Sequence, residues 1–341
     1  MKLFFILFII FEKNRGVYNM ELVSKLFELT RAYSLTMTLA SCLIILSYAC
    51  YSEKFSFLNF GLLVIAICAI HLGSNLFDCY IDVKKKLKEG FSFENMVFSN
   101  ERKARLIRNG DFSLKQVEII FSTLFLIGSL IGLYFAFISG WQVLLFALLG
   151  GILCLFYPIS SKYYLAEITV GLIFGPITIM GGYYALTGDY NSNLFLLSWV
   201  IFFTTIILLH THNIMDWEFD INNNKNTLAI LTKNKHNAIY ALKLMIIASY
   251  ALITIGVLAL HFNPKMLYVF LTLPIATKLL ESINDYINIK DVKFEPRWYW
   301  GMFENWQNIK EQKIDFFMFR FYLARNFAFY FALFASLGAI L

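Results

Sequence analysis

The stretch LLSWVIFFTTIILLHTHNIMDWEFD, residues 196–220, decides the fold class of this protein. A long apolar run passes directly into polar and acidic residues at its end. A helix that crosses a bilayer needs about 20 mostly apolar residues, and the segment that leads to Asp216 has this length. Eight further segments meet the same requirement, so the sequence predicts an all-α polytopic membrane protein. The nine predicted spans cover residues 33–52, 58–81, 117–138, 141–157, 165–187, 193–215, 238–261, 266–283 and 316–340.

The composition of the whole chain agrees with this class. Of its 341 residues, 59% are apolar and 15% are charged, whereas globular proteins have about 45–50% and about 25%. This apolar excess excludes a soluble globular domain and a disordered chain. The five cysteines show no spacing typical of a zinc site or a disulfide framework. In a membrane protein a net charge of +6 reflects topology, so no nucleic-acid partner is expected.

The basic residues indicate which loops face the cytoplasm. If the N-terminus is cytoplasmic, the loops after the second, fourth, sixth and eighth spans are cytoplasmic too. Of the 29 Lys and Arg residues, only Lys54 and Lys265 then lie on the other side. Cytoplasmic loops carry an excess of basic residues, so we expect this orientation.

The first residues are a separate case. MKLFFILFIIF, residues 1–11, is basic at one end but too short to span a bilayer. A second methionine, Met20, opens a more ordinary amphipathic start, so translation from Met20 and a real interfacial segment both stay open. We assign no function to residues 1–27 and expect residues 28–341 to form the transmembrane domain.

Two copies of one acidic pattern form an internal repeat at the ends of the second and sixth spans. Only nine Asp residues occur in the chain, and four of them belong to these copies. On a helix, side chains at i and i+4 lie on one face with Cβ atoms about 5–6 Å apart, so each copy presents two carboxylates and an amide together. The copies, 138 residues apart, are Asn75-x-x-Asp78-x-x-x-Asp82 and Asn213-x-x-Asp216-x-x-x-Asp220.

Carboxylates so close together at the edge of hydrocarbon need compensation. A divalent cation supplies it, and magnesium takes one or two carboxylates and completes its coordination with water and phosphate oxygens. Two such clusters could hold a diphosphate between two Mg²⁺ ions, with Lys225, Arg108 and Lys162 as basic partners. The alternative is that the acids are solvated helix ends and that the basic residues only set the topology.

Three segments resemble the UbiA superfamily of intramembrane prenyltransferases. NIMDWEFDINNNKNTL (213–228) is similar to the second acidic motif of that family, and RLIRNGDFSLKQV (105–117) is similar to its stretch before the third helix. LAEITVGLIFGPITIMGGYYALTG (165–188) resembles the branch that prenylates 1,4-dihydroxy-2-naphthoate. The chain departs from the family pattern at Ser74-Asn75, where the family usually has Asn-Asp, so one customary carboxylate is missing. It also departs at Met215, Asn224 and Ala32.

The resemblance implies a fold and an activity. The fold is nine helices around a central cavity, and the activity is Mg²⁺-dependent transfer of a polyprenyl group from its diphosphate to an aromatic acceptor. For this branch, the acceptor is 1,4-dihydroxy-2-naphthoate in menaquinone synthesis, and the location is a bacterial inner membrane with the site on the cytoplasmic side. No obligate protein partner is expected.

The resemblance also assigns roles to single residues. The expected metal ligands are Asp78, Asp82, Asp216 and Asp220, which we expect to be catalytic together with Tyr157. Diphosphate is expected at Asn75, Asn213, Lys162, Lys225, Arg108 and Arg31. Glu167, His71 and His212 are candidates to face the acceptor, although His71 could instead be a helix-contact histidine and Glu167 a helix cap.

Two other classes share parts of this pattern. An ion-coupled transporter also has intramembrane acids and internal repeats, but its acids lie near the middle of the bilayer. Here they lie at span ends beside basic loops. Among enzymes, a UbiA-type prenyltransferase with a benzoate, haem or lipid acceptor is the alternative.

The charge asymmetry gives a testable topology. Cysteines introduced in loops 82–116, 216–236 and 284–315 should react with a membrane-impermeant maleimide only after the cytoplasmic side is opened, because the basic residues hold these loops inside. Labelling of any of them from outside intact cells would contradict the assignment.

Overall fold

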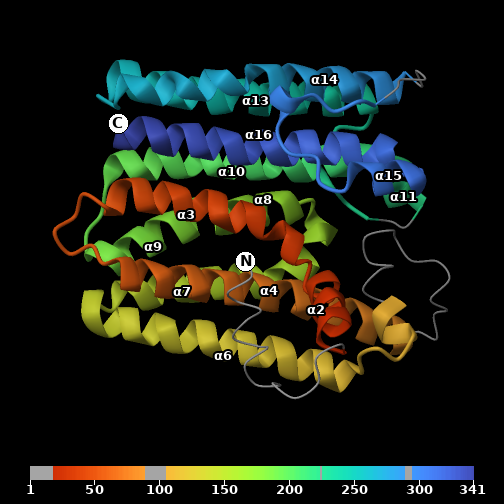
Figure 1. Ribbon diagram of the computed structural model, residues 1–341, viewed down its shortest axis with the longest axis horizontal. Coiled ribbons are helices and arrows are strands. Elements are labelled where there is room, and N and C mark those ends of the chain that lie inside the picture. Colours follow the sequence, from red (N-terminus) through yellow and green to blue (C-terminus); the bar gives the residue numbers. More distant parts are fainter. Residues whose placement is uncertain (1–17, 89–104, 223–224, 289–293) are drawn as a thin grey trace. The chain divides into compact units, whose positions relative to one another are not determined.

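The computed structural model describes residues 18–88, 105–222, 225–288 and 294–341, and all regular structure in these ranges is helical (Figure 1). Within this part of the chain, nine helices are long and apolar enough to cross a membrane, which confirms the predicted number. The described contacts divide the chain into two compact units. Unit 1 holds the described residues of Met1–Thr38 and Phe57–Tyr134, and unit 2 holds Leu39–Ser56 and Phe135–Leu341.

Unit 1 contains the first acidic motif. Its elements are α2 (Tyr18–Leu29), η1 (Ala32–Ser34), the start of α3 (Leu35–Ala49), α4 (Phe57–Lys88) and most of α6 (Leu114–Ser139). The core joins residues of all of these elements, including Leu29, Leu76 and Val117, which are fully buried. The rings of Tyr80 and Phe121 meet edge to face at 5.4 Å between centroids, an arrangement that aromatic pairs favour. The core therefore fixes α2 against the end of α4 that carries the acids.

Unit 2 contains the second acidic motif and is built around α10 (Ser192–Met215). This helix packs against α8, α13 and α16, and a larger share of it is buried than of any other described span. The other elements are α7 (Gln142–Ser160), η3 (Ser161–Tyr163), α8 (Ala166–Leu172), η4 (Ile173–Ile177), α9 (Thr178–Thr187), α11 (Trp217–Asn222), α12 (Leu228–Leu231), α13 (Lys235–Ala259), η5 (Pro264–Thr272), α14 (Leu273–Ile287), η6 (Trp298–Trp300), α15 (Trp306–Glu311) and α16 (Asp315–Ile340).

The fifth span is broken, where the sequence predicts one helix over 165–187. A π-helical turn separates α8 from α9, and Gly175 within it leaves the helical conformation, with φ −83° and ψ −106°. Pro176 removes a backbone donor at this point, and the hydroxyl of Ser41 donates to the carbonyl of Phe174 at 2.8 Å. A Cβ on Gly175 would lie 2.6 Å from the carbonyl oxygen of Ser198 on α10. Glycine at this position therefore allows η4 and α10 to approach closely.

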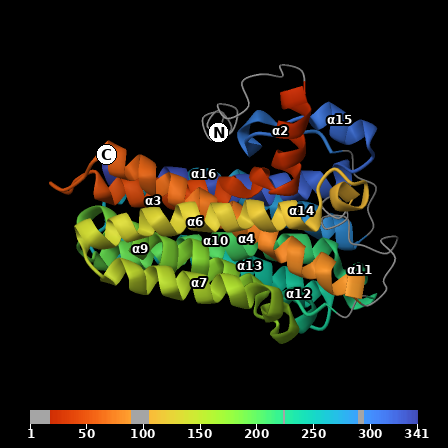
Figure 2. The ribbon, with the colours of Figure 1, turned by 90° about the horizontal axis from the view of Figure 1, so that it is seen from below.

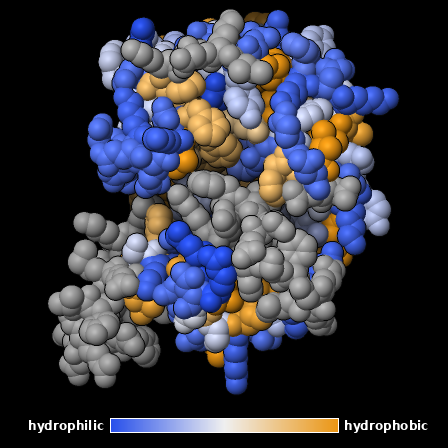
Figure 3. Space-filling model, turned by 90° about the vertical axis from the view of Figure 1, so that its right-hand side faces the viewer, coloured by the Kyte–Doolittle hydropathy of each residue, from blue (hydrophilic) through white to orange (hydrophobic). Residues whose placement is uncertain are grey.

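Three connections of unit 2 lie at the same end of its helices, at the right in Figures 1 and 2. They join α7 to α8, α10 to α13, and α14 to α16. Figure 3 views this end, where many of the described side chains of unit 2 are hydrophilic. The antiparallel order of the helices thus collects at one end Lys162, the second acidic motif and Lys225.

Candidate functional site

The second acidic motif lies where α10 ends. The sequence predicts one helix through both acids, but α10 stops at Met215 and a separate helix, α11, begins at Trp217. Asp216 lies between them, and the backbone N–H of Asp220 donates to the Asp216 carbonyl at 2.8 Å. The break therefore preserves the i, i+4 relation of the two acids. The carboxylate of Asp216 contacts Nε2 of His212 at 2.9 Å.

Asp220 is a buried carboxylate with one close basic partner. Its side chain is fully buried, and within the described part of the chain neither of its oxygens accepts a hydrogen bond. The ammonium of Lys225 lies 3.3 Å from Oδ1. Burial raises the pKa of Asp220, the nearby Lys225 opposes this, and the charge of Asp216 raises it further. A carboxylate in this state is stabilised either by protonation or by a further cation.

The loop after α11 folds back onto the start of the fifth span. The backbone N–H of Lys225 donates to the Asp220 carbonyl at 2.9 Å. The side chain of Asn226 donates to the Lys162 carbonyl, also at 2.9 Å, and Thr227 caps the N-terminus of α12. These bonds bring Lys225 to Asp220 and place Lys162 beside the same loop.

Glu167 and Asn213 contact each other. Glu167 is 1% exposed, and its Oε1 accepts hydrogen bonds from the Asn213 side-chain amide and from the backbone N–H of Leu228, the latter at 2.9 Å. The sequence places Asn213 at the diphosphate and Glu167 at the acceptor. In the structure the two side chains instead join α10, α8 and the start of α12, a contact that no spacing in the sequence indicates.

The first acidic motif lies on one continuous helix of unit 1. Asp78 and Asp82 are half-buried and one turn apart on α4, which continues to Lys88. The loop that the sequence begins at residue 82 therefore begins later, and Asp82 is still helical. In contrast to the second motif, both acids share an unbroken helix face.

The amide of Asn75 contacts the junction between α2 and α3. It donates to the carbonyl of Thr30 and to the hydroxyl of Ser34, both at 3.1 Å. His71 lies between Ser34 and Thr38, at 3.0 and 2.6 Å from their hydroxyl oxygens. This geometry favours the helix-contact interpretation of His71.

Two further predicted residues, Arg31 and Arg108, lie in unit 1. Arg31 has a left-handed backbone, with φ 52°, at the junction of α2 and η1, and its carbonyl accepts from Ser34 Oγ at 2.8 Å. Arg108 is exposed at the end of a helical segment. Ion pairs hold this segment to α2, one of them between Lys25 and Asp111 at 2.7 Å.

Tyr157 lies in the last turn of α7, in unit 2, and is half-buried. Asn224 lies outside the described residues. The predicted site residues that the structure describes thus form two groups, one in unit 1 and one in unit 2.

A cation suits the second motif. In either unit, as far as it is described, no three His, Cys, Asp or Glu side chains come together as a ready-made metal site. Magnesium, however, takes only one or two carboxylates when water and phosphate oxygens complete its octahedron. Asp216 and Asp220 supply such a pair of hard oxygen donors, and the unbonded buried oxygens of Asp220 fit this role.

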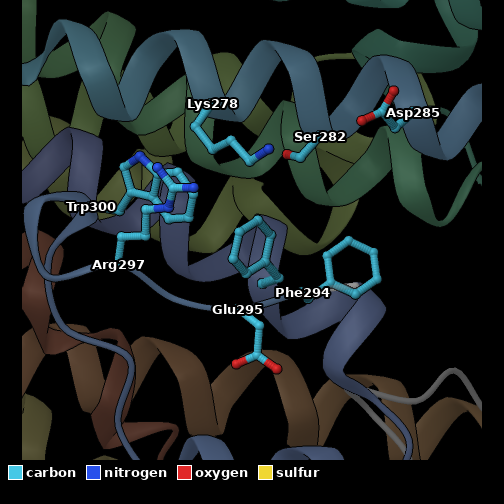
Figure 4. A pocket seen from close by; sticks show the side chains of 8 residues that line it. Lys278, Ser282, Asp285, Phe294, Glu295, Arg297 and Trp300 are labelled. Carbon is cyan, nitrogen blue, oxygen red and sulfur yellow. The ribbon is translucent and has the colours of Figure 1, made fainter. Parts of the chain in front are cut away.

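A cavity of about 160 Å³ lies elsewhere in unit 2, between α14, α16 and the segment that joins them. Lys278 of α14, Arg297 of the connection and Trp300 lie at its edge (Figure 4). Lys278 Nζ and Arg297 Cζ are each 5.4 Å from the Trp300 ring centroid. None of the predicted site residues lines it. Tyr286 of α14, the residue after the lining residue Asp285, donates to the Met215 carbonyl at 2.9 Å.

The sequence analysis missed Tyr286 and Asn226. Tyr286 stands among several tyrosines near span ends, and its partner is a backbone carbonyl, so no local pattern marks it. Asn226 lies inside the motif, but its partner is the carbonyl of Lys162, distant in sequence. Only the tertiary fold reveals either contact.

Comparisons with known proteins agree on one class. The model of the UbiA prenyltransferase family matches residues 36–303. The chain therefore belongs to the UbiA prenyltransferase family, and it is an integral membrane prenyltransferase.

Individual relatives are more distant. The 1,4-dihydroxy-2-naphthoate octaprenyltransferase of Bacillus subtilis (strain 168) is 25% identical over 270 residues, which are 77% of this chain and 82% of that protein. Among solved structures, a UbiA homologue from Archaeoglobus fulgidus bound to GPP and Mg²⁺ has a TM-score of 0.57 at 12% identity, covering 89% of this chain and 99% of that one. The apo UbiA homologue from Aeropyrum pernix K1 has a TM-score of 0.54 at 16% identity, with coverages of 93% and 98%. These structures confirm the fold.

The buried charge of Asp220 should lower the stability of the metal-free protein. Because burial raises the pKa of Asp220, the ionised form costs stability above that pKa and costs nothing once the carboxyl is protonated. Asp220→Asn should therefore raise the melting temperature of the metal-free protein at pH 7.5, and this gain should shrink as the pH falls.

Glu218→Gln is the matched control, two residues away on α11. Lys235 lowers the pKa of Glu218, so loss of this charge should leave the melting temperature unchanged or slightly lower. Thermal unfolding in detergent with chelator measures both variants from pH 5 to 8. A lower melting temperature for Asp220→Asn than for the parent at pH 7.5 would contradict the analysis.

Proposed function

We propose that this protein transfers a polyprenyl group from its diphosphate to an aromatic acceptor in a Mg²⁺-dependent reaction, with 1,4-dihydroxy-2-naphthoate as the acceptor. The observation that carries the proposal is the arrangement of Asp216, Asp220 and Lys225. It combines a pair of carboxylates, one of them buried and without a hydrogen bond from the described residues, with an ammonium group at 3.3 Å. The A. fulgidus homologue that shares the fold binds GPP and Mg²⁺, which supports a prenyl diphosphate as the donor.

The residues of this chain would divide the work as follows. Asp216 and Asp220 would hold Mg²⁺ in unit 2, and Asp78 and Asp82 would do so in unit 1. When bound, the metal would stabilise the negative charge of the leaving diphosphate. Lys225 is half-buried beside Asp220 and would share that charge through its ammonium group.

Other basic side chains would bind the outer diphosphate oxygens. Lys162 and Arg108 are exposed on their connections, and Arg31 is the third candidate. Departure of the diphosphate leaves an allylic cation, which aromatic faces stabilise and which must be kept from water. Tyr157, half-buried in the last turn of α7, is the aromatic side chain that we assign to this role.

The naphthoate acceptor rests on two supports. One is the similarity of residues 165–188 to the naphthoate branch, and the other is the B. subtilis relative. In that segment Gly171 and Gly175 lie against α10, where an added Cβ would come within 3 Å of neighbouring atoms. We also propose a bacterial inner membrane as the location, with the connections that carry both motifs in the cytoplasm, because their basic residues favour that side.

The metal requirement can be tested on the carboxylates. Asp78→Ala and Asp216→Ala should each lower turnover at least about a thousandfold, because each removes one metal ligand where charge develops. Product formation from a long-chain prenyl diphosphate in membranes, with Mg²⁺ and with excess chelator, measures the effect, and equal membrane insertion is the control. Full activity of either variant, or of the parent protein in chelator, would contradict the metal–diphosphate proposal.

The acceptor can be tested by competition. With equal concentrations of 1,4-dihydroxy-2-naphthoate and 4-hydroxybenzoate, the naphthoate should be prenylated faster, by about 5- to 150-fold, since pocket contacts typically discriminate by about 1–3 kcal/mol. Mass spectrometry of the products measures the ratio. Preferential use of the benzoate, or use of neither compound, would contradict the acceptor while leaving the prenyltransferase class intact.

A further inference from the structure

We infer that Glu167 is a positioning residue that holds the second acidic motif and its lysine loop in place, and that it does not act on the acceptor. Its carboxylate is 1% exposed, at the start of α8. One oxygen, Oε1, accepts two hydrogen bonds, from the Asn213 amide on α10 and from the Leu228 N–H at the start of α12, while Oε2 is buried and accepts none from the described residues. A single side chain thus joins the segments on both sides of Asp216 and Asp220.

These two bonds determine where the loop between them closes. Residues 213 and 228 are the first and last of the motif, and both are fixed to the same oxygen atom. Between them, Lys225 donates its N–H to the Asp220 carbonyl and places its ammonium 3.3 Å from the Asp220 carboxylate. Without Glu167, Asn213 and the Leu228 N–H would lose their acceptor, and the loop that carries Lys225 would lose a main attachment to α8.

Unit 1 contains a corresponding asparagine contact with a different hydrogen-bond acceptor. Asn75, which the repeat pairs with Asn213, donates to the carbonyl of Thr30 and to Ser34 Oγ. In the repeat, Glu167 occupies the position of Leu29, next to Thr30. Thr30 follows the end of α2, where a main-chain carbonyl is free to accept. In α8 the carbonyls are used within the helix, so a side chain is needed as the acceptor.

The contacts also separate this role from general-base catalysis. Both hydrogen bonds end on one oxygen, and a glutamine carbonyl has the two lone pairs needed to accept both. Glu167→Gln should therefore keep the loop in place although it can no longer accept a proton. A general base would lose its function equally in Glu167→Gln and Glu167→Ala.

The test compares Glu167→Gln, Glu167→Ala and the control Glu218→Gln, which removes the same charge from α11 without touching Leu228. The first readout is the rate of trypsin cleavage after Lys225 in the purified, metal-free protein. Hydrogen exchange of the peptide over residues 225–231 accompanies it. The second readout is the affinity for Mn²⁺, measured by electron paramagnetic resonance, and the third is KM for the prenyl diphosphate against kcat.

We expect Glu167→Ala to be cleaved after Lys225 at least about tenfold faster than the parent, as follows from the loss of two buried hydrogen bonds. Mn²⁺ affinity should fall and KM should rise by a similar factor. Glu167→Gln and Glu218→Gln should stay within about threefold of the parent in all three readouts. Equal losses of kcat in Glu167→Gln and Glu167→Ala, with unchanged cleavage, would overturn the inference in favour of direct catalysis.

The statement about Mn²⁺ and KM rests on the proposed function, whereas cleavage and exchange do not. If the protein does not bind the cation but Glu167→Ala still frees the loop, the proposed function fails and the positioning role stands. If the parent binds the cation and Glu167→Ala leaves the loop as protected as in the parent, the positioning role fails alone.

Discussion

The structure of unit 2 depends on the burial of two carboxylates, Asp220 and Glu167, at the end of a bundle that is otherwise apolar. A buried charge is costly unless it is paired and hydrogen-bonded. Among the described residues, Glu167 accepts two hydrogen bonds on Oε1 and none on Oε2, whereas neither oxygen of Asp220 accepts one and only the ammonium of Lys225 lies close to it. The two acids therefore differ: Glu167 is held by its neighbours in the fold, and Asp220 keeps both oxygens without a hydrogen bond, which supports the proposed cation site.

The same division explains the asparagines of both motifs. An amide near hydrocarbon needs a partner, and hydrogen bonds between helices are among the forces that hold membrane bundles together. Asn75 and Asn213 find that partner at the start of the preceding span in their own unit. The repeat thus duplicates a joint between helices as well as a pair of acids, and this joint sets the direction in which the acids lie.

The sequence predicts the parts of this arrangement that are local. Nine spans follow from runs of apolar residues, and the acid pairs follow from a repeated spacing. The sequence does not predict the helix break at Asp216. Asp216 and Asp220 keep their i, i+4 spacing when α11 starts at the next residue, so the spacing is the same with or without the break. The π-turn at Gly175 and the contacts of Glu167 and Tyr286 depend on neighbouring segments that are distant in the chain. The spacing of residues in the sequence does not indicate these neighbours.

The roles expected for Asn213 and His71 show where a family resemblance needs a structure. A polar residue that recurs beside an acidic motif can either bind substrate or hold helices together. Both roles use the same types of residue, so the sequence does not distinguish them. The geometry distinguishes them here, because the His71 ring lies between two hydroxyls of the neighbouring segment and the Asn213 amide is bound to Glu167. A side chain whose polar atoms already have partners inside the protein can reach a substrate only by giving those partners up. Asp220 has no hydrogen bond from the described residues to give up, which supports its proposed role as a ligand.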